Sequence, residues 1–439
     1  MSAVAAEAAR RTTGTLQDLV SPLGGLITTV TQLAVEPSNP PLQVFSADLG
    51  DVSTVITNLC GPECLGSLDG TGTGVDPELA RIVGIAEALE RYANCIFDEK
   101  QIRWASAEEL GDEALDLDAL PRVSATELAD PHCGIAVPDK TAQMRWVRGM
   151  NLRTRKLSWI PAVLVYMHFS AHGAESITNP ISTGAAAHYD PARAICGALC
   201  EVIERDAISL IWLQRLALPR LELDVVGPQL RRFLDLCADR DVTVELFDAT
   251  TDLGIPTVYA VSIAREHPTC RTVVACATGL DPQAAAAKAI SETVSVRIAL
   301  QGDRAPDDVH DFTGVSDGAI YMAAPERADA FDFLLNSPAR RRLSEMPTLT
   351  AGDSTADLRL VLDRLDASGL DSYLVDLTPD EALRVGMTVV RAVIPGLLPL
   401  SFTYRSRFLG SPRLYEAPVR MGHPSRAEHE LNSWPQPFA

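Results

Sequence analysis

Two five-residue motifs of the form E-x-x-E-R place acidic side chains where they could do chemistry. One motif is "EALER", from Glu87 to Arg91, and the other is "EVIER", from Glu201 to Arg205. Residues three apart share a helix face, so the two glutamates of each motif point the same way, and the arginine can pair with the first glutamate. Two such helices facing each other would gather four carboxylates: Glu87, Glu90, Glu201 and Glu204.

Each motif begins eleven residues after the aspartate of an Asp-Pro pair, at Asp76 and at Asp190. A third pair begins at Asp281, and eleven residues after it stands Glu292. Aspartate is a favoured N-cap and proline is favoured at the first helical position, so each pair predicts a helix start. Eleven residues are close to three helical turns, so each glutamate should emerge near the azimuth of its cap. The pattern predicts the same local structure three times: a helix that starts at an Asp-Pro pair and carries a glutamate eleven residues after the aspartate.

A solvated helix face with i,i+4 salt bridges is the usual meaning of one E-x-x-E-R motif. Two copies and a third glutamate at the same offset favour a gathered site instead. Carboxylates in a protein interior repel one another unless cations lie between them. Oxygen-only ligands favour Mg²⁺ or Ca²⁺, and Mg²⁺ usually arrives with substrate phosphates. Residues 68–77 and 179–191, rich in small side chains, precede two of the helices and are phosphate-loop candidates, with a plain turn as the alternative.

The composition limits the classes of function. The 439 residues carry 38 basic and 58 acidic side chains, a net charge of -20, which argues against a nucleic-acid binder. We identify no signal peptide and no apolar run long enough to span a membrane. The nine cysteines show no disulfide framework and indicate a reduced, cytoplasmic protein.

Strand-like and helix-like segments alternate along the chain. Residues 144–167 read as a hairpin, and further strands are expected around 242–264, 271–280, 372–380 and 388–398. Helices are expected at about 225–240, 282–300, 323–345 and 354–367. This alternation predicts an α+β architecture of mixed sheets with packed helices, arranged in repeated α/β lobes.

These residues together resemble the YcaO-domain family of ATP-dependent enzymes that activate backbone amides. The matching stretches include "GTGVDPELARIVGIAEALERYA", "STGAAAHYDPARAICGALCEVIERDA", "GLDPQAAAAKAISETVSVR" and "VVRAVIPGLLPLS". The resemblance implies a YcaO fold around a central Mg-ATP site. It also implies that Glu87, Glu90, Glu201 and Glu204 hold Mg²⁺ ions bound to ATP. Expected nucleotide contacts are Ser182, Thr183, Arg205, Glu292 and Arg297.

The resemblance also divides the chain. Residues 1–24 are expected to be a flexible N-terminal segment, 25–424 the catalytic domain, and 425–439 a proline-containing tail that reaches the active site. Azoline-forming members often end in P-x-P-x-P, and this chain has "PQPFA". The catalytic tail residues implied are Pro435, Pro437 and Ala439.

The implied reaction is cyclodehydration of Cys, Ser or Thr in a ribosomally made precursor peptide to a thiazoline or oxazoline. The resemblance further implies a separate E1-like or ThiF-like partner protein that binds the leader peptide, and a homodimer. Thioamide or amidine formation at the same ATP site is an alternative within the family. From other classes, a non-catalytic scaffold subunit or a carboxylate-rich metal hydrolase would also fit part of the pattern.

Overall fold

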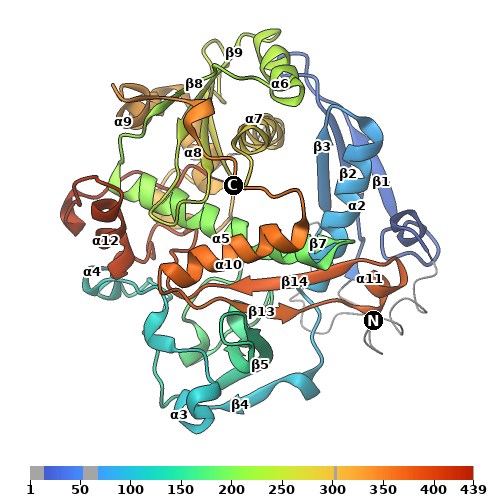
Figure 1. Ribbon diagram of the computed structural model, residues 1–439, viewed down its shortest axis with the longest axis vertical. Helices are drawn as coiled ribbons and strands as arrows, with labels where there is room; N and C mark the ends of the chain where they lie inside the picture. The colour runs from blue at the N-terminus through green and yellow to red at the C-terminus, as the bar shows by residue number, and fades with distance from the viewer. Residues whose placement is uncertain (1–13, 53–67, 301–303, 439) are drawn as a thin grey trace.

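Three separate β-sheets form the framework of the protein (Figure 1). The computed structural model describes residues 14–52, 68–300 and 304–438. The first sheet has the order β1-β2-β3, the second β4-β5-β13-β14-β7 with β6 paired to β5, and the third β11-β10-β9-β8-β12. The strands of the first sheet are β1 (Thr29–Leu33), β2 (Gln43–Asp48) and β3 (Gly70–Gly74). Those of the second are β4 (Arg103–Ala105), β5 (Met144–Asn151), β6 (Lys156–Pro161), β7 (Ala185–His188), β13 (Tyr373–Asp376) and β14 (Thr388–Val393). Those of the third are β8 (Arg220–Glu222), β9 (Val242–Asp248), β10 (Thr257–Ala264), β11 (Thr272–Thr278) and β12 (Arg340–Arg342).

One edge strand of each sheet leads through an Asp-Pro pair into a long helix. Strand β3 leads into α2 (Pro77–Ala93), β7 into α5 (Pro191–Gln214) and β11 into α7 (Pro282–Ala299). The side chains of Asp76, Asp190 and Asp281 accept backbone N–H groups from the first turns of these helices, and each proline is the first helical residue. The expected local structure, present three times, is confirmed as a strand–Asp-Pro–helix unit.

Helix α5 lies at the centre of the molecule (Figure 1). It contacts β7 and β14 of the second sheet, β11 of the third sheet, and the helices α10 and α12. Its apolar residues Ala198, Leu199 and Ile203 are fully buried, as the sequence pattern predicts. The remaining helices are α3 (Ala107–Leu110), α4 (Ala125–Leu128), α6 (Pro228–Ala238), α8 (Asp317–Ala323), α9 (Asp332–Leu335), α10 (Ser354–Ala367), α11 (Asp380–Arg384) and α12 (Pro412–Arg420).

The glycine-rich stretch before α2 is a strand and not a phosphate loop, so that interpretation was wrong. A Cβ on Gly72 would lie 1.7 Å from the carbonyl oxygen of Ala80, and one on Gly70 would lie 2.1 Å from that of Gly84. Strand and helix therefore touch backbone to backbone, which only glycine permits. The second small-residue stretch likewise ends in a strand, β7. Gly184, which has a φ of 87°, lies just before this strand and against the carbonyl of Ala392.

Most of the predicted elements are present, with one clear exception. The hairpin of β5 and β6 is confirmed, and so are the helices at 228–238, 282–299 and 354–367. The single helix expected at 323–345 is wrong: α8 ends at Ala323, and short helices and strand β12 follow. Pro325 and Pro338 explain the break. Proline disfavours the helical conformation of the residue before it, and it has no backbone N–H to donate a hydrogen bond.

The two ends of the described chain pack onto the folded body. In the segment expected to be flexible, Leu16 and Leu19 are buried in the same apolar cluster as residues of α2, β5 and β14, and residues 1–13 lie outside the described residues. At the other end, the Trp212 indole donates to the carbonyl of Trp434, and Phe438 is buried. Across the described ranges, no helix is long and apolar enough to cross a lipid bilayer.

Candidate active site

A cavity of about 700 Å³ lies where the three strand–Asp-Pro–helix units meet. Helices α2, α5 and α7 and strands β7 and β11 all contribute side chains to its wall. Its charged lining consists of Glu87, Glu90, Glu201, Glu204, Arg205, Lys288 and Glu292. The fold thus brings together the four glutamates of the two E-x-x-E-R motifs and the third glutamate at the same offset.

Backbone N–H groups position all four motif glutamates in the same way. Oε2 of Glu87 accepts from Thr71 of β3 at 2.8 Å, and Oε2 of Glu90 accepts from Ala187 of β7 at 3.1 Å. On α5, Glu201 Oε2 accepts from Gly184 at 3.0 Å, and Glu204 Oε2 accepts from Thr278 of β11 at 2.8 Å. Edge strands have backbone groups without a strand partner, and these carboxylates satisfy some of them. Each glutamate uses Oε2 for this purpose, which leaves Oε1 for other partners.

Cationic side chains balance part of the negative charge. Arg91 pairs with Glu87 Oε1 at 2.8 Å, and Arg205 approaches Glu201 Oε1 at 3.5 Å, as the i,i+4 spacing predicts. Lys288, which the sequence reasoning missed, has its Nζ 3.7 Å from Glu204 and 3.4 Å from Glu292. The i,i+4 spacing of Lys288 and Glu292 on α7 is the signal that could have identified it.

Two carboxylates of the cavity, those of Glu90 and Glu204, lie in an environment that raises their pKa. Burial, followed by the charges of Glu201 and Glu87, raises the pKa of Glu90 to about 8. Burial also raises the pKa of Glu204 to about 7, with Glu292 adding to the increase and Lys288 opposing it. A bound cation would relieve both the desolvation and the repulsion.

The raised pKa of Glu90 predicts a loss of stability in alkaline, metal-free solution. The free energy of unfolding that this group contributes is fully present below about pH 4.5 and is lost as the pH rises through about 8. We expect wild type to lose about 4 kcal/mol more than Glu90→Gln between about pH 5 and about pH 9. Denaturant unfolding at the two pH values measures this difference.

The matched control for this experiment is Glu416→Gln, which alters an exposed carboxylate on α12. It should lose the same free energy as wild type between the two pH values. Adding Mg²⁺ and an ATP analogue should shrink the gap between wild type and Glu90→Gln. Equal losses in wild type and Glu90→Gln would show that the cluster is not strained by its own charge.

The donor set fits Mg²⁺ that is shared with a phosphate ligand. Among the described residues, no three Asp, Glu, His or Cys side chains converge closely enough to form a complete metal site. Mg²⁺ is usually held by one or two carboxylates, with waters and substrate phosphates completing its octahedron. A cavity with paired carboxylates on facing helices, and with Lys288 and Arg205 in its wall, suits a Mg²⁺–polyphosphate ligand better than a bare ion.

The expected nucleotide contacts separate into two groups. Arg205 and Glu292 line the cavity, whereas Ser182 and Thr183 lie in the loop before β7, and Thr183 lines a smaller cavity beside it. Arg297 is fully buried elsewhere in α7. Its guanidinium donates to the carbonyl oxygens of Cys270 and Ser262 and to the Ser262 hydroxyl. These hydrogen bonds link α7 to β10 and to the segment just before β11. Arg297 does not line the glutamate cavity.

The described part of the C-terminal tail reaches the cavity. Phe438, its last described residue, is part of the cavity wall together with residues of α5 and α7. The Phe438 ring packs edge-on against Tyr259, with ring centroids 5.3 Å apart. Pro435 and Pro437 are buried along the same path, whereas Ala439 lies outside the described residues.

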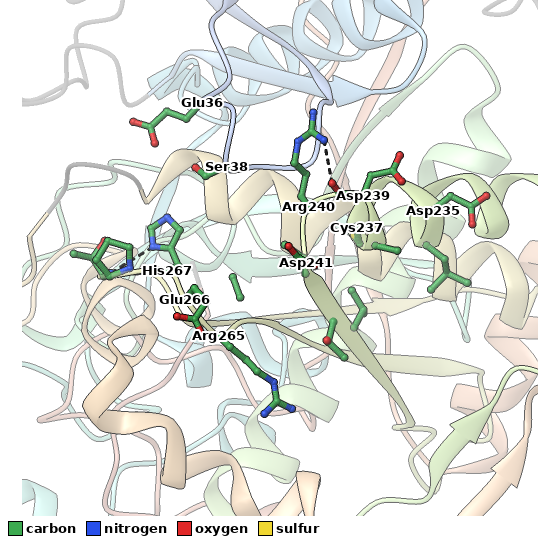
Figure 2. A pocket seen from close by; sticks show the side chains of 18 of the residues that line it. Glu36, Ser38, Asp235, Cys237, Asp239, Arg240, Asp241, Arg265, Glu266 and His267 are labelled. Carbon is green, nitrogen blue, oxygen red and sulfur yellow. Dashed lines mark hydrogen bonds between the residues drawn. The ribbon is translucent and has the colours of Figure 1, made fainter.

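A larger hollow of about 1300 Å³ lies elsewhere, between α6, β9 and the turn after β10 (Figure 2). Acidic and basic side chains are mixed around it, including Asp235, Arg240, Asp241 and Arg265. None of the glutamates described above lines it. Size alone therefore does not mark the candidate active site, and we assign that role to the glutamate cavity.

The fold and the site define a mixed α+β protein that holds paired carboxylates in a cavity suited to Mg²⁺-bound phosphates. The family model for YcaO cyclodehydratase, ATP- and Mg²⁺-binding, matches residues 71–398, and the chain belongs to the YcaO family. An uncharacterized protein of Methanothermobacter thermautotrophicus is 29% identical over 74% of this chain and 80% of its own length.

Solved structures share the fold. A heterocyclase in complex with substrate and cofactor superimposes with a TM-score of 0.78 at 22% identity, over 98% of this chain. This chain spans 57% of the length of that heterocyclase. YcaO from Methanopyrus kandleri, bound with AMPPCP and Mg²⁺, has a TM-score of 0.61 at 19% identity and covers 85% of this chain and 86% of its own.

Proposed function

We propose that this chain is an ATP- and Mg²⁺-dependent cyclodehydratase that converts Cys, Ser or Thr of a ribosomally made precursor peptide to thiazoline or oxazoline. The observation that carries the proposal is the convergence of Glu87, Glu90, Glu201 and Glu204 on one cavity, each oriented by a backbone N–H. Membership of the YcaO family and the fold shared with a heterocyclase support the same reaction.

The proposed reaction replaces an amide oxygen by a ring bond. The side-chain S–H or O–H of the peptide releases its proton to solvent as the sulfur or oxygen bonds to the preceding amide carbon. The former carbonyl oxygen then takes the γ-phosphoryl group of ATP, and the bond from that group to ADP breaks. The carbon–oxygen bond then breaks, phosphate leaves with that oxygen, and the nitrogen gives up its proton as the C=N bond forms. The products are the azoline, ADP and phosphate.

The chain's own residues contribute orientation and charge to this reaction. Mg²⁺, when bound, would neutralise the transferring phosphoryl group. Glu87, Glu90, Glu201 and Glu204 would hold the metal. The backbone N–H groups that donate to them, in β3, in β11 and in and just before β7, keep the four carboxylates oriented toward the cavity. Lys288 and Arg205 extend positive charge into the cavity, and Glu292 keeps Lys288 in place.

The precursor peptide and a separate E1-like or ThiF-like partner complete the proposed system, and a homodimer is part of the same proposal. The test is the intact mass of a Cys-containing precursor incubated with this protein, its partner and Mg-ATP. We expect the loss of one water mass for each ring formed. Replacing ATP with AMPPCP should leave the mass unchanged.

The other outcomes of this experiment identify the alternatives. A gain in mass from exchanging oxygen for sulfur would indicate thioamide formation at the same site. No change in mass, with nucleotide bound, would indicate a scaffold subunit. Metal binding without any nucleotide binding would indicate a metal hydrolase. Each of the three results contradicts the cyclodehydratase proposal.

A further inference from the structure

A second, smaller cavity adjoins the active site and contains a buried arginine with an unused donor. The cavity has a volume of about 100 Å³ and lies on the other side of the loop that carries Thr183. Arg391, on β14, lines it and is only 5% exposed. Nε of Arg391 donates to the carbonyl of Leu164 at 3.3 Å, and Nη2 donates to that of Ile181 at 2.6 Å. Nη1 is buried and has no hydrogen-bond partner.

A guanidinium in this position is costly to bury. No carboxylate of the described residues forms an ion pair with Arg391, and its only hydrogen bonds go to backbone carbonyls. Burial lowers the pKa of Arg391 to about 10, and the charges of Glu201 and Glu90 oppose this decrease. A buried donor without an acceptor destabilises the protein unless a ligand supplies one. A carbonyl oxygen would satisfy Nη1.

Most of the remaining cavity wall is apolar, and Thr178, Asn179 and Thr183 are its other polar members. The apolar members include Val163, Ile181, Val202, Ile394, Leu397 and Phe408. An apolar cavity of about 150 Å³ accommodates benzene, so a volume of about 100 Å³ suits a valine or leucine side chain and excludes an indole. Val202 lines this cavity and Glu201, the residue before it, lines the glutamate cavity, so helix α5 contributes to the walls of both.

We propose that this cavity binds the aliphatic side chain of the substrate residue that precedes the ring-forming Cys, Ser or Thr, while Arg391 Nη1 donates to that residue's carbonyl oxygen. This inference rests on the proposed function, because the occupant is the substrate peptide. The geometry favours this residue because its carbonyl is the group that must lie next to the phosphates held at Glu90 and Glu201. The cavity would therefore set the sequence preference on the amino side of each ring.

The test measures binding of N-acetyl-Xaa-Cys-amide peptides by ligand-observed NMR, with AMPPCP and Mg²⁺ present. We expect the peptides with Val or Leu at Xaa to bind about tenfold more tightly than the Gly peptide, and the Trp peptide to bind no better than Gly. Equal affinities across the series, or no binding of any peptide, would overturn the inference.

Two variants separate the side-chain pocket from the arginine. Ile181→Ala enlarges the cavity, so the preference should move from Val and Leu toward Phe, whereas Ile195→Ala, which alters a partly buried residue of α5 outside this cavity, should keep the wild-type order. Arg391→Lys should weaken all the peptides by a similar factor, because the carbonyl contact is common to them. An unchanged order in Ile181→Ala would contradict the inference even if Arg391→Lys fails to fold.

Titrating AMPPCP with Mg²⁺ in the same samples distinguishes this inference from the proposed function. If nucleotide binds and the peptides do not discriminate, the pocket assignment fails and the cyclodehydratase proposal stands. If nucleotide does not bind, the proposed function fails, and the peptide series reports on the pocket by itself.

Discussion

Glu201→Gln should reduce peptide-dependent ATP consumption by at least about 10³-fold while the protein stays folded. The substitution removes a negative charge without changing the shape of the side chain, so the hydrogen bond from the Gly184 N–H can persist through the amide oxygen. What is lost is the charge that would hold Mg²⁺ and the pairing with Arg205. Release of phosphate, measured with and without precursor, gives the result.

The matched control is Glu416→Gln. Glu416 also forms an i,i+4 pair with an arginine, Arg420, at 3.4 Å, but its side chain is exposed on α12. This variant should retain wild-type ATP consumption. Thermal unfolding should show that Glu201→Gln without Mg²⁺ stays cooperatively folded, because the side chain keeps its shape and its hydrogen bond from Gly184. Full turnover by Glu201→Gln would rule out the proposed metal role.

The helix starts could be predicted from the sequence because helix capping depends on local contacts. The convergence of the glutamates could be predicted because the same motif is repeated at the same offset. Asp76, Asp190 and Asp281 cap their helices through contacts within one turn, so the sequence contains the whole signal. A single E-x-x-E-R motif is ambiguous. Its repetition at a constant offset indicates a shared environment, and the structure shows that environment to be one cavity.

The glycine-rich segments show where local reasoning was insufficient. The sequence "GTGTG" is compatible with a phosphate loop or a strand, and propensity favours neither strongly. What decides for a strand is the backbone of α2, which approaches Gly70 and Gly72 so closely that a Cβ would not fit. That contact is set by the packing of the helix on the sheet, which composition does not specify.

Charged residues that act across elements were the least predictable part of the site. Arg297 lies on the same helix as Glu292, α7, but five residues further along, so its side chain leaves a different face of the helix. It donates to the carbonyl oxygens of Ser262 and Cys270 and does not reach the glutamate cavity. Arg391 lies in an apolar strand and gives no local signal. Its relation to Glu90 and Glu201 arises only when β14 is placed beside β7 and α5.

Phe438→Ala should lower ring formation by at least about 100-fold while nucleotide binding is retained. Phe438 lines the cavity and packs on Tyr259, so it anchors the tail that carries Pro435 and Pro437. Loss of the ring would remove the contact with Tyr259 that holds the described end of the tail at the glutamate cavity. Intact mass of the precursor and titration with AMPPCP and Mg²⁺ measure the two properties separately.

Phe233→Ala is the control for stability. Phe233 on α6 and Phe438 are each 5% exposed, so both truncations should cost about 3–5 kcal/mol of unfolding free energy. Phe233 packs in a different apolar cluster and does not line the glutamate cavity. If ring formation depends on the tail, only Phe438→Ala will lose it at a temperature where both variants remain folded. Equal losses of ring formation in the two variants would mean that the effect reflects general destabilisation and that the tail has no specific part in the reaction.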